Sequence, residues 1–300
     1  MTDVWETDYT KTFHHTPYPA ISPTRPELSA ANKTIFITGG GSGLGAGFVE
    51  AFATAGAAHI ITIGRRLGHL DAVAARTRAA HPSTTITTIS CDVTREADVA
   101  AAFARVKEIA PRGVDVVVAN SGYLSEVEPV KAASGDAAAD AAVTADWWRG
   151  WEVNVKGVYL VARHFLAAAS GPGAVFLNIS AAACMITPVL PGFSSYAPSK
   201  IGTCRFIETL QAENPQLRFH NIHPGCIKTD MLTKSKLEEI DLPLDDLELA
   251  SHFLVWLASP EGEFLKGKYL WSNWDVDELK ARKAEIQAPN KLVTGLVGWA

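Results

Sequence analysis

The stretch KTIFITGGGSGLGAGFVEAFATAGA, residues 33–57, decides the fold of this chain. It begins with a short run of β-branched and apolar residues, breaks into glycines, and continues with small and apolar residues at helical spacing. Gly39, Gly43 and Gly45 would let backbone N–H groups approach a pyrophosphate, and a helix beginning near Leu44 would point its positive end at that charge. Glycine-rich strings also mark ordinary turns, so the position between a strand and a helix is what favours a nucleotide site.

The same alternation of strand and helix continues along most of the chain. Apolar strands that alternate with helices are typical of a parallel sheet covered on both faces. We therefore predict an α/β fold with a doubly wound parallel sheet, a Rossmann fold. The further expected strands are 59–66, 84–93, 114–122, 174–180 and 217–225, and the further expected helices are 70–81, 96–110, 147–169 and 196–213.

Residues 1–32 are rich in Pro, Thr and His and have neither helical nor strand periodicity, which predicts an irregular N-terminal arm. His14 and His15 have no acidic or cysteine neighbour in the sequence, so we interpret them as solvent-exposed loop residues rather than metal ligands. The remainder, 33–300, is predicted to be one domain. Its Ala-rich segment 126–146, punctuated by Gly and Pro, is predicted to be a surface excursion.

The composition excludes several classes of protein. A hydrophobic fraction of 47% and a charged fraction of 20% are typical of a soluble globular chain. The net charge of −5 provides no attraction for nucleic acid or anionic membrane surfaces. The four cysteines are scattered, which indicates reduced thiols and no zinc site or other metal centre. There is no signal-peptide core and no apolar run of membrane-spanning length, so we expect a cytoplasmic protein.

The end of the second expected strand indicates which cofactor is preferred. A free ribose 2′-hydroxyl is usually met there by Asp or Glu, whereas this strand ends Ile63-Gly64-Arg65-Arg66. Two guanidinium groups and no carboxylate favour a 2′-phosphate, so NADP(H) is expected in preference to NAD(H). Solvation of the next helix start is an alternative role for either arginine, and for Arg66 the two roles remain equally open.

From Lys33 to about Trp274 the chain resembles the short-chain dehydrogenase/reductase family. Any one of the matching motifs is weak, but together they occur in the family's order, each at the end of the expected element. They are Thr38 to Gly45 for TGxxxGxG, Asp92-Val93 after the third strand, Asn120-Ser121-Gly122 after the fourth, Asn154 in WEVNVKG, Tyr196 and Lys200 for Tyr-x-x-x-Lys, Pro224-Gly225 after the sixth strand, and Thr229.

The resemblance implies an NAD(P)-dependent oxidoreductase that acts on a small molecule, and a homodimer or homotetramer. The arm and the C-terminal tail, about 271–300, resemble those of fungal members. The implied substrate loop covers about 226–246, and the implied apolar wall includes Met185, Ile186, Phe193, Met231 and Leu232, each of which has a competing core role. The implied cofactor-binding residues are Gly39, Gly41, Ser42, Gly43, Leu44, Gly45, Arg65, Arg66, Asp92, Val93, Asn120, Ser121, Gly122, Tyr196, Lys200, Pro224, Gly225, Ile227 and Thr229.

Tyr196 and Lys200 are four residues apart, so on a helix they lie on one face, one turn apart. A nearby ammonium lowers the pKa of a phenol, which predicts Tyr196 as general acid toward a carbonyl or base toward an alcohol. Pro198 is tolerated if the helix begins near Ser194 or Ser195. By resemblance, Lys200 also holds the nicotinamide ribose, and Asn154 holds a water that relays protons.

The family's catalytic serine has no clear counterpart. Aligning Asn178-Ile179-Ser180-Ala181 with the family's Asn-x-Ser-Ser places Ser180 in the first serine position and Ala181 in the second, active one. Side chains alternate along a strand, so Ser180 replaces the missing hydroxyl only if the backbone twists locally. Ser180 is the first candidate for this catalytic role. Thr187, Ser194 and Ser195 are the others.

Three functions remain open from the sequence. The first is an NADPH-dependent reductase of a small or medium apolar ketone, or the reverse alcohol dehydrogenase. The second is a non-redox catalyst such as a cyclase, which the alanine at position 181 favours. The third is a binding protein that senses NADPH.

Overall fold

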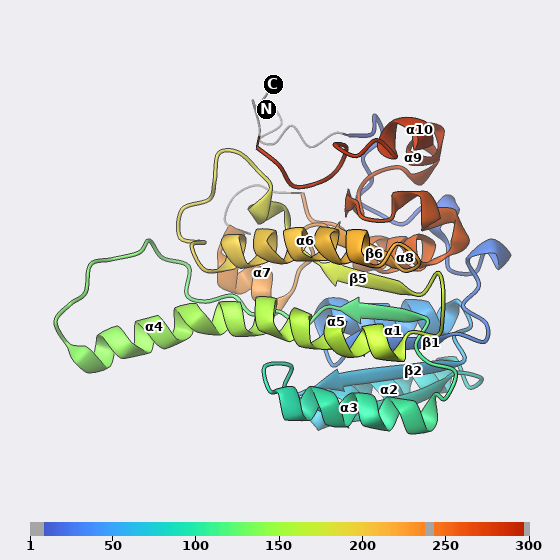
Figure 1. Cartoon of the computed structure of the whole chain (residues 1–300), viewed down its shortest axis with the longest axis horizontal. Coiled ribbons are helices and arrows are strands. Elements are labelled where there is room, and N and C mark those ends of the chain that lie inside the picture. Colours follow the sequence, from blue (N-terminus) through green and yellow to red (C-terminus); the bar gives the residue numbers. More distant parts are fainter. Residues whose placement is uncertain (1–8, 238–242, 297–300) are drawn as a thin grey trace.

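A computed structural model describes residues 9–237 and 243–296, and the predicted fold is confirmed (Figure 1). Seven strands form one parallel sheet in the order β3-β2-β1-β4-β5-β6-β7. The direction in which the chain adds strands reverses between β1 and β4, which opens a crevice at the carboxyl ends of these strands. The strands are β1 Thr34–Thr38, β2 His59–Gly64, β3 Thr85–Ser90, β4 Val116–Ala119, β5 Val175–Ile179, β6 Arg218–His223 and β7 Tyr269–Trp271.

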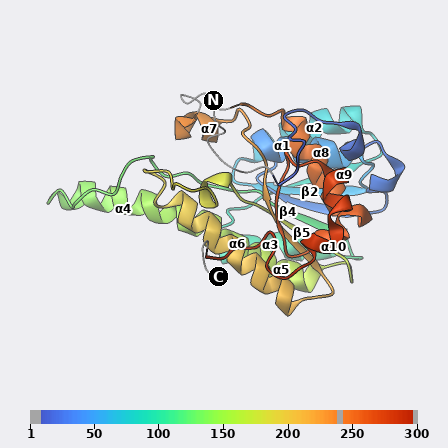
Figure 2. The same cartoon turned by 90° about the horizontal axis from the view of Figure 1, so that it is seen from above.

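Helices cover both faces of the sheet. Figure 2 shows α1, α2 and α8 on one side and α3, α5 and α6 on the other. Each layer closes its own apolar core, and under α5 the ring of Phe176 lies 5.6 Å from that of Phe165 and 5.7 Å from that of Phe219. The α-helices are α1 Gly43–Thr54, α2 Leu67–Ala80, α3 Glu96–Ile109, α4 Ala137–Trp151, α5 Gly157–Ala168, α6 Tyr196–Glu213, α7 Asp230–Ser235, α8 Leu247–Ala258, α9 Val276–Ala281 and α10 Lys283–Ile286.

The segment expected as a surface excursion is partly helical, which corrects the sequence analysis. Helix α4 begins at Ala137, ten residues before the expected start. The carboxylate of Asp136 accepts hydrogen bonds from the backbone N–H groups of Ala138 and Ala139, and the alanines that follow favour the helix. Both views show α4 and the segment before it extending away from the sheet (Figures 1 and 2).

The described part of the N-terminal arm is irregular, as predicted, apart from two short 3-10 turns, η1 Pro19–Ile21 and η2 Pro26–Leu28. Its two histidines are not free loop residues, however. His14 Nε2 lies 2.9 Å from Asp275 Oδ2, and His15 Nδ1 lies 2.5 Å from Asp245 Oδ1. Their acidic partners are more than 200 positions away, so inspection of the neighbouring sequence could not find them.

The C-terminal part of the chain contains elements that the sequence analysis did not predict. β7 adds a seventh strand, and α7 lies inside the implied substrate loop 226–246. Residues 238–242 of that loop are outside the described ranges, as are the ends of the arm and of the tail. Across the described ranges, no helix combines the length and the apolar character needed to cross a membrane.

Candidate active site

A cavity of about 1350 Å³ opens at the carboxyl ends of the strands, where β1 and β4 diverge. Pockets for a single ligand have volumes of roughly 300–1,000 Å³, so this cavity has room for a dinucleotide and a substrate. Of the predicted site residues, these line it: Gly39, Gly41, Ser42, Gly43, Leu44, Arg65, Arg66, Asp92, Val93, Asn120, Ser121, Gly122, Ser180, Tyr196, Lys200, Pro224, Gly225, Ile227 and Thr229. Gly45 and Asn154 lie behind its wall.

The glycine loop has the backbone that a phosphate site needs. Gly39 and Gly43 have φ angles of +72° and +49°, a region that L side chains rarely adopt. A Cβ at Gly45 would lie 2.1 Å from the carbonyl oxygen of Gly39, so Gly45 permits the close turn from β1 into α1. A Cβ at Gly43 would project to within 3.4 Å of Thr229 Cγ2, across the space that a cofactor would enter. The loop therefore fits a dinucleotide pyrophosphate at the N-terminus of α1.

Hydrogen bonds fasten this loop to the end of β4. Thr38 Oγ1 accepts from the backbone N–H groups of Asn120 and Ser121, both at 2.9 Å, and Asn120 Nδ2 donates to the carbonyl oxygen of Thr38 at 3.0 Å. The family motifs at Thr38 and Asn120 thus act as a pair. Their contact positions the two walls of the nucleotide crevice relative to each other.

Where the ends of β2 and β3 meet the cavity, one carboxylate lies with exposed arginines. Burial raises the pKa of Asp92, but hydrogen bonds from Thr94 and the charges of Arg65 and Arg149 outweigh it, so the pKa of this carboxyl lies below its ordinary value. The side chains of Arg65 and Arg66 are exposed at the end of β2 and line the cavity. No Asp or Glu stands at this strand end, as the sequence indicated.

Lys200 is buried and Tyr196 is half-buried near the start of α6, which begins at Tyr196 and so places Pro198 in the first helical turn. Lys200 Nζ donates to the carbonyl oxygen of Ile179 at 2.7 Å and lies 5.7 Å from the centre of the Tyr196 ring. Burial lowers the pKa of Lys200 to about 8. Burial also raises the pKa of Tyr196, and the neighbouring Cys184 adds to that effect. The phenol pKa is thus raised, not lowered as expected, because desolvation disfavours the phenolate.

Asn154 lies in a π-helical turn, η3 Glu152–Lys156, between α4 and α5, and it is completely buried. Its Oδ1 accepts from the N–H of Tyr123 at 2.8 Å, and its Nδ2 donates to the Tyr123 carbonyl at 2.9 Å and to Ser199 Oγ at 3.0 Å. Both amide hydrogens are therefore used within the protein. The side chain positions the segment after β4 against α6.

The hydroxyl of Ser180 is directed at two cysteines. Its Oγ lies 3.1 Å from Cys204 Sγ and 3.4 Å from Cys184 Sγ, and the residue is 2% exposed. Ala181 follows in an extended conformation and is a partly exposed residue of the cavity wall. The side chains of Ser180 and Ala181 therefore point in opposite directions, as expected, although both residues follow the end of β5.

The other candidate hydroxyls are engaged away from Tyr196. Ser194 Oγ accepts from Trp147 Nε1 at 3.1 Å, and Ser195 Oγ donates to the Trp147 carbonyl at 2.6 Å. Thr187 is not one of the residues that line the cavity. These hydroxyls tie α4 to the start of α6.

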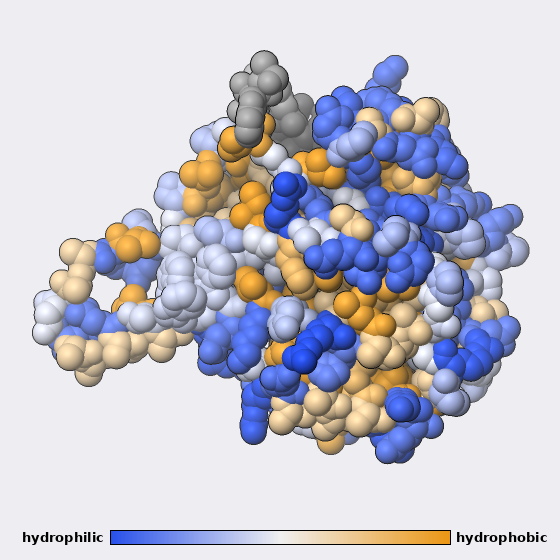
Figure 3. All heavy atoms as spheres, viewed as in Figure 1, coloured by the Kyte–Doolittle hydropathy of each residue, from blue (hydrophilic) through white to orange (hydrophobic). Residues whose placement is uncertain are grey.

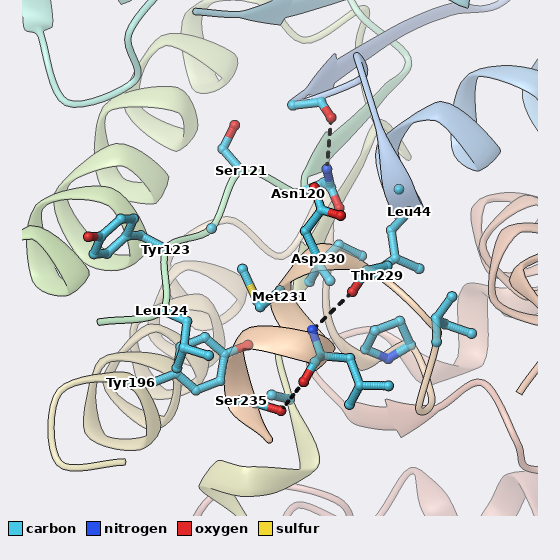
Figure 4. Close-up of a pocket in the computed structure, with 18 of the residues that line it drawn as sticks. Leu44, Asn120, Ser121, Tyr123, Leu124, Tyr196, Thr229, Asp230, Met231 and Ser235 are labelled. Atoms are coloured by element: carbon cyan, nitrogen blue, oxygen red, sulfur yellow. Dashed lines mark hydrogen bonds between the residues drawn. The ribbon is translucent and has the colours of Figure 1, made fainter. Parts of the chain in front are cut away.

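Three of the five residues expected in the substrate wall line the cavity. Phe193, Met231 and Leu232 line the cavity, and Figure 4 shows Met231 with Leu124 in the same pocket as Tyr196. Met185 and Ile186 do not, because they pack against the core on the side of α1 and α8.

Other cavity residues could not be found from local patterns. Phe13 and His15 come from the N-terminal arm, Asp245 from the segment before α8, and Trp271 and Asn273 from the end of β7. Residues so distant in the chain meet only after folding.

The chain belongs to the short chain dehydrogenase family, because the model of that family matches residues 33–240. It is 32% identical over 291 residues to the short chain dehydrogenase/reductase AacuD of Aspergillus aculeatus, with 96% of each chain covered. It is 34% identical over 299 residues to the short chain dehydrogenase pigC of Monascus ruber, covering 95% of this chain and 92% of that one. These fungal relatives include the arm and the tail in their matched length.

Solved structures agree on the fold. A short chain dehydrogenase from Salmonella enterica serovar Typhi superposes with a TM-score of 0.72 at 20% identity, covering 83% of this chain and 98% of that one. A short-chain type dehydrogenase/reductase from Mycobacterium ulcerans superposes with a TM-score of 0.70 at 23% identity, covering 81% of this chain and 89% of that one. As a member of this family, the protein is an NAD(P)-dependent oxidoreductase.

The buried ammonium of Lys200 predicts a specific pH dependence of stability. Its pKa of about 8 in the folded state lies below the ordinary 10.5, so between these pH values the unfolded state binds more protons and stability rises with pH. The free energy of unfolding of the wild type should gain about 3 kcal/mol relative to Lys200→Met from pH 8 to pH 10.5. Urea titrations of both proteins at several pH values across this range measure the difference in the free energy of unfolding. If this free energy changes with pH by the same amount in both proteins, the burial of a charged Lys200 is contradicted.

Proposed function

We propose that this protein is an NADPH-dependent reductase of a ketone, which in the reverse direction oxidises the corresponding secondary alcohol with NADP⁺. The observation that carries the proposal is the pair of half-buried Tyr196 and buried Lys200 on one face of α6, in a cavity that the glycine loop also lines. A bound nicotinamide would supply the hydride. The residues that would hold it are those of the glycine loop together with Asp92, Asn120, Lys200 and Thr229.

Tyr196 supplies the proton. Because burial raises the pKa of its phenol, Tyr196 carries its proton at neutral pH and can donate it to a carbonyl oxygen as hydride reaches the carbonyl carbon. This protonation state favours reduction. In the reverse direction Tyr196 must first lose that proton, which requires additional positive charge near the phenol.

Lys200 Nζ lies 5.7 Å from the centre of the Tyr196 ring, and Lys200 reaches both the β5 end and the cavity. In this proposal it stabilises the phenolate left after proton donation and holds the cofactor ribose. Asn154 maintains this geometry by joining Tyr123 to Ser199, one residue before Lys200.

NADPH is the proposed cofactor because the end of β2 presents Arg65 and Arg66 to the cavity and no carboxylate. A guanidinium binds a phosphate through charge-assisted hydrogen bonds and leaves a free ribose hydroxyl without its usual acceptor. Arg65 follows the strand directly and is the stronger candidate.

We also propose a homodimer or homotetramer that pairs through α5 and α6. Tyr159, Leu166 and Ile201 are large apolar residues exposed on these helices, and Figure 3 shows apolar side chains on the face that the helices present. Sedimentation velocity tests this assembly, and the finding of a monomer would contradict it.

The free cysteines fit a cytoplasmic location, and cell fractionation tests this location.

A second candidate is a non-redox reaction in the same cavity. It is favoured by one observation, that Ala181 occupies the wall where the family places its serine. Deuterium from 4-deuterated NADPH appears in the product of a reductase and not in the product of a cyclase. A product that forms without deuterium in either 4-labelled form would refute the reductase.

Tyr196→Phe should lower kcat for ketone reduction by about 100- to 10,000-fold, because it removes the general acid and keeps the ring. NADPH consumption with a panel of alkyl and aryl ketones measures this. The matched control is Tyr9→Phe, which removes a phenolic hydroxyl that donates to Glu285 outside the cavity. An unchanged kcat in the Tyr196→Phe variant would contradict the proposed role of Tyr196 as general acid.

Ala181→Ser should raise kcat at least about tenfold, because it adds a hydrogen-bond donor for the developing oxyanion at an extended, unstrained position. Ala183→Ser is the control, since it adds the same hydroxyl two residues further along the cavity wall. If Ala181→Ser is no faster than the wild type, the plain ketone-reductase interpretation of this wall is wrong.

Arg65→Ala should raise the KM for NADPH by about ten- to a hundredfold and leave that for NADH nearly unchanged, because only NADPH has the phosphate that pairs with this arginine. Arg76→Ala, on the exposed face of α2, serves as the matched control. Equal effects on both cofactors would show that Arg65 does not read the 2′-phosphate.

A further inference from the structure

The N-terminal arm forms part of the cavity wall. Phe13 and His15 line the cavity with Trp271 and Asn273 from the other end of the chain. The arm is held there independently of any ligand, since Phe13 forms a β-bridge with Trp274 and the N–H of His14 donates to the carbonyl of Asn273 at 2.7 Å. It is therefore a fixed wall of the substrate chamber.

Aromatic rings follow one another along this wall. The His223 ring centre lies 4.4 Å from that of Trp271, Trp271 lies 6.3 Å from Phe13, and Phe13 lies 5.5 Å from His15. The row begins beside the β5 end, where His223 Nδ1 accepts from the N–H of Ala182 at 3.1 Å. It continues from His223 at the end of β6 through Trp271 at the end of β7 to the imidazole of His15 on the arm, and such a wall fits a flat, apolar ring system.

At the far end of the row, a buried carboxylate orients His15. Asp245 accepts from the N–H of Cys226 at 2.6 Å, from Asn273 Nδ2 at 2.9 Å and from His15 Nδ1 at 2.5 Å. The Asp245 side chain is 4% exposed and that of His15 is 41% exposed. The carboxylate is thus fixed, and one edge of the imidazole remains accessible.

The hydrogen bond to Asp245 determines what His15 can bind. A carboxylate that accepts from Nδ1 selects the Nδ1–H tautomer, so Nε2 of the neutral ring becomes a hydrogen-bond acceptor. Within the described ranges, Nε2 of His15 makes no hydrogen bond. The group that complements this acceptor is the O–H of a ligand.

We propose that His15, oriented by Asp245, binds a hydroxyl group of the substrate at the end of the chamber remote from Tyr196. The inference rests on the proposed reductase function and names its substrate class, an aryl ketone with a hydroxyl on the ring system distal to the carbonyl. Phe13 and Trp271 contact the rings between the two polar ends. The proposed substrate therefore has a hydroxyl group that binds His15, a residue that the sequence alone did not place in the site.

His14 provides a contrast within the arm. Its Nε2 is paired with Asp275 and its ring stacks on that of Tyr18 at 3.6 Å, and it does not line the cavity. Of the two adjacent histidines, His14 therefore anchors the arm and His15 faces the ligand.

The test compares two ketones, 2-acetylnaphthalene and 6-hydroxy-2-acetylnaphthalene, with NADPH and the full chain. The wild type should have a kcat/KM at least about tenfold higher for the hydroxylated ketone, mainly through KM, because the hydroxyl satisfies a preformed acceptor. His15→Phe should reduce this ratio to about one, and His15→Gln, which retains an acceptor, should restore part of it. His81→Phe, which removes a surface histidine paired with Glu50, should leave the ratio unchanged.

Each outcome decides a different point. Reduction of both ketones with equal kcat/KM overturns the role of His15 and leaves the reductase standing. If neither is reduced, calorimetry compares their binding to the chain saturated with NADP⁺. A preference for the hydroxylated ketone that His15→Phe abolishes would uphold the site and count against the reductase, whereas equal or absent binding overturns the site.

Discussion

The hydrogen bonds between Thr38 and the segment after β4 are the constraint on which the site depends. They join the ends of the two central strands at the point where the strand order reverses, through Asn120 and Ser121. The glycine loop on one side and the Tyr123 segment on the other are placed by this one junction. The nucleotide crevice is consequently a property of the sheet topology, and the side chains at its edges adapt it to phosphate.

Burial organises the chemistry beside this crevice. Lys200 is buried and held by the carbonyl of Ile179, and the half-buried Tyr196 lies one turn before it. The same burial that costs stability moves the pKa of Lys200 toward neutrality and keeps the Tyr196 phenol protonated. Asn154 supports the arrangement from the π-helical turn, where the helix widens enough to direct its amide to Tyr123.

Much of this could be predicted because each family motif stands at the junction of a strand and the next helix. The sheet, the start of α6 at Tyr196 and nearly all cavity residues of the cofactor side follow from that pattern. Local patterns did not predict every feature of the site. The alanine-rich segment forms α4, which Asp136 caps, and the raised pKa of Tyr196 reflects a burial that residue spacing cannot show.

The sequence by itself determined the fold class, the family and the order of the expected cofactor and catalytic residues, because these are set by short-range periodicity and by residues adjacent to strand ends. Tertiary structure alone decided where Ser180 points, that Ala181 faces the cavity, and that His15 meets Asp245. The physical reason is that hydrogen bonds and desolvation act through space. A serine between two sulfurs and a histidine beside a carboxylate 230 positions away acquire their roles only when the sheet brings them together.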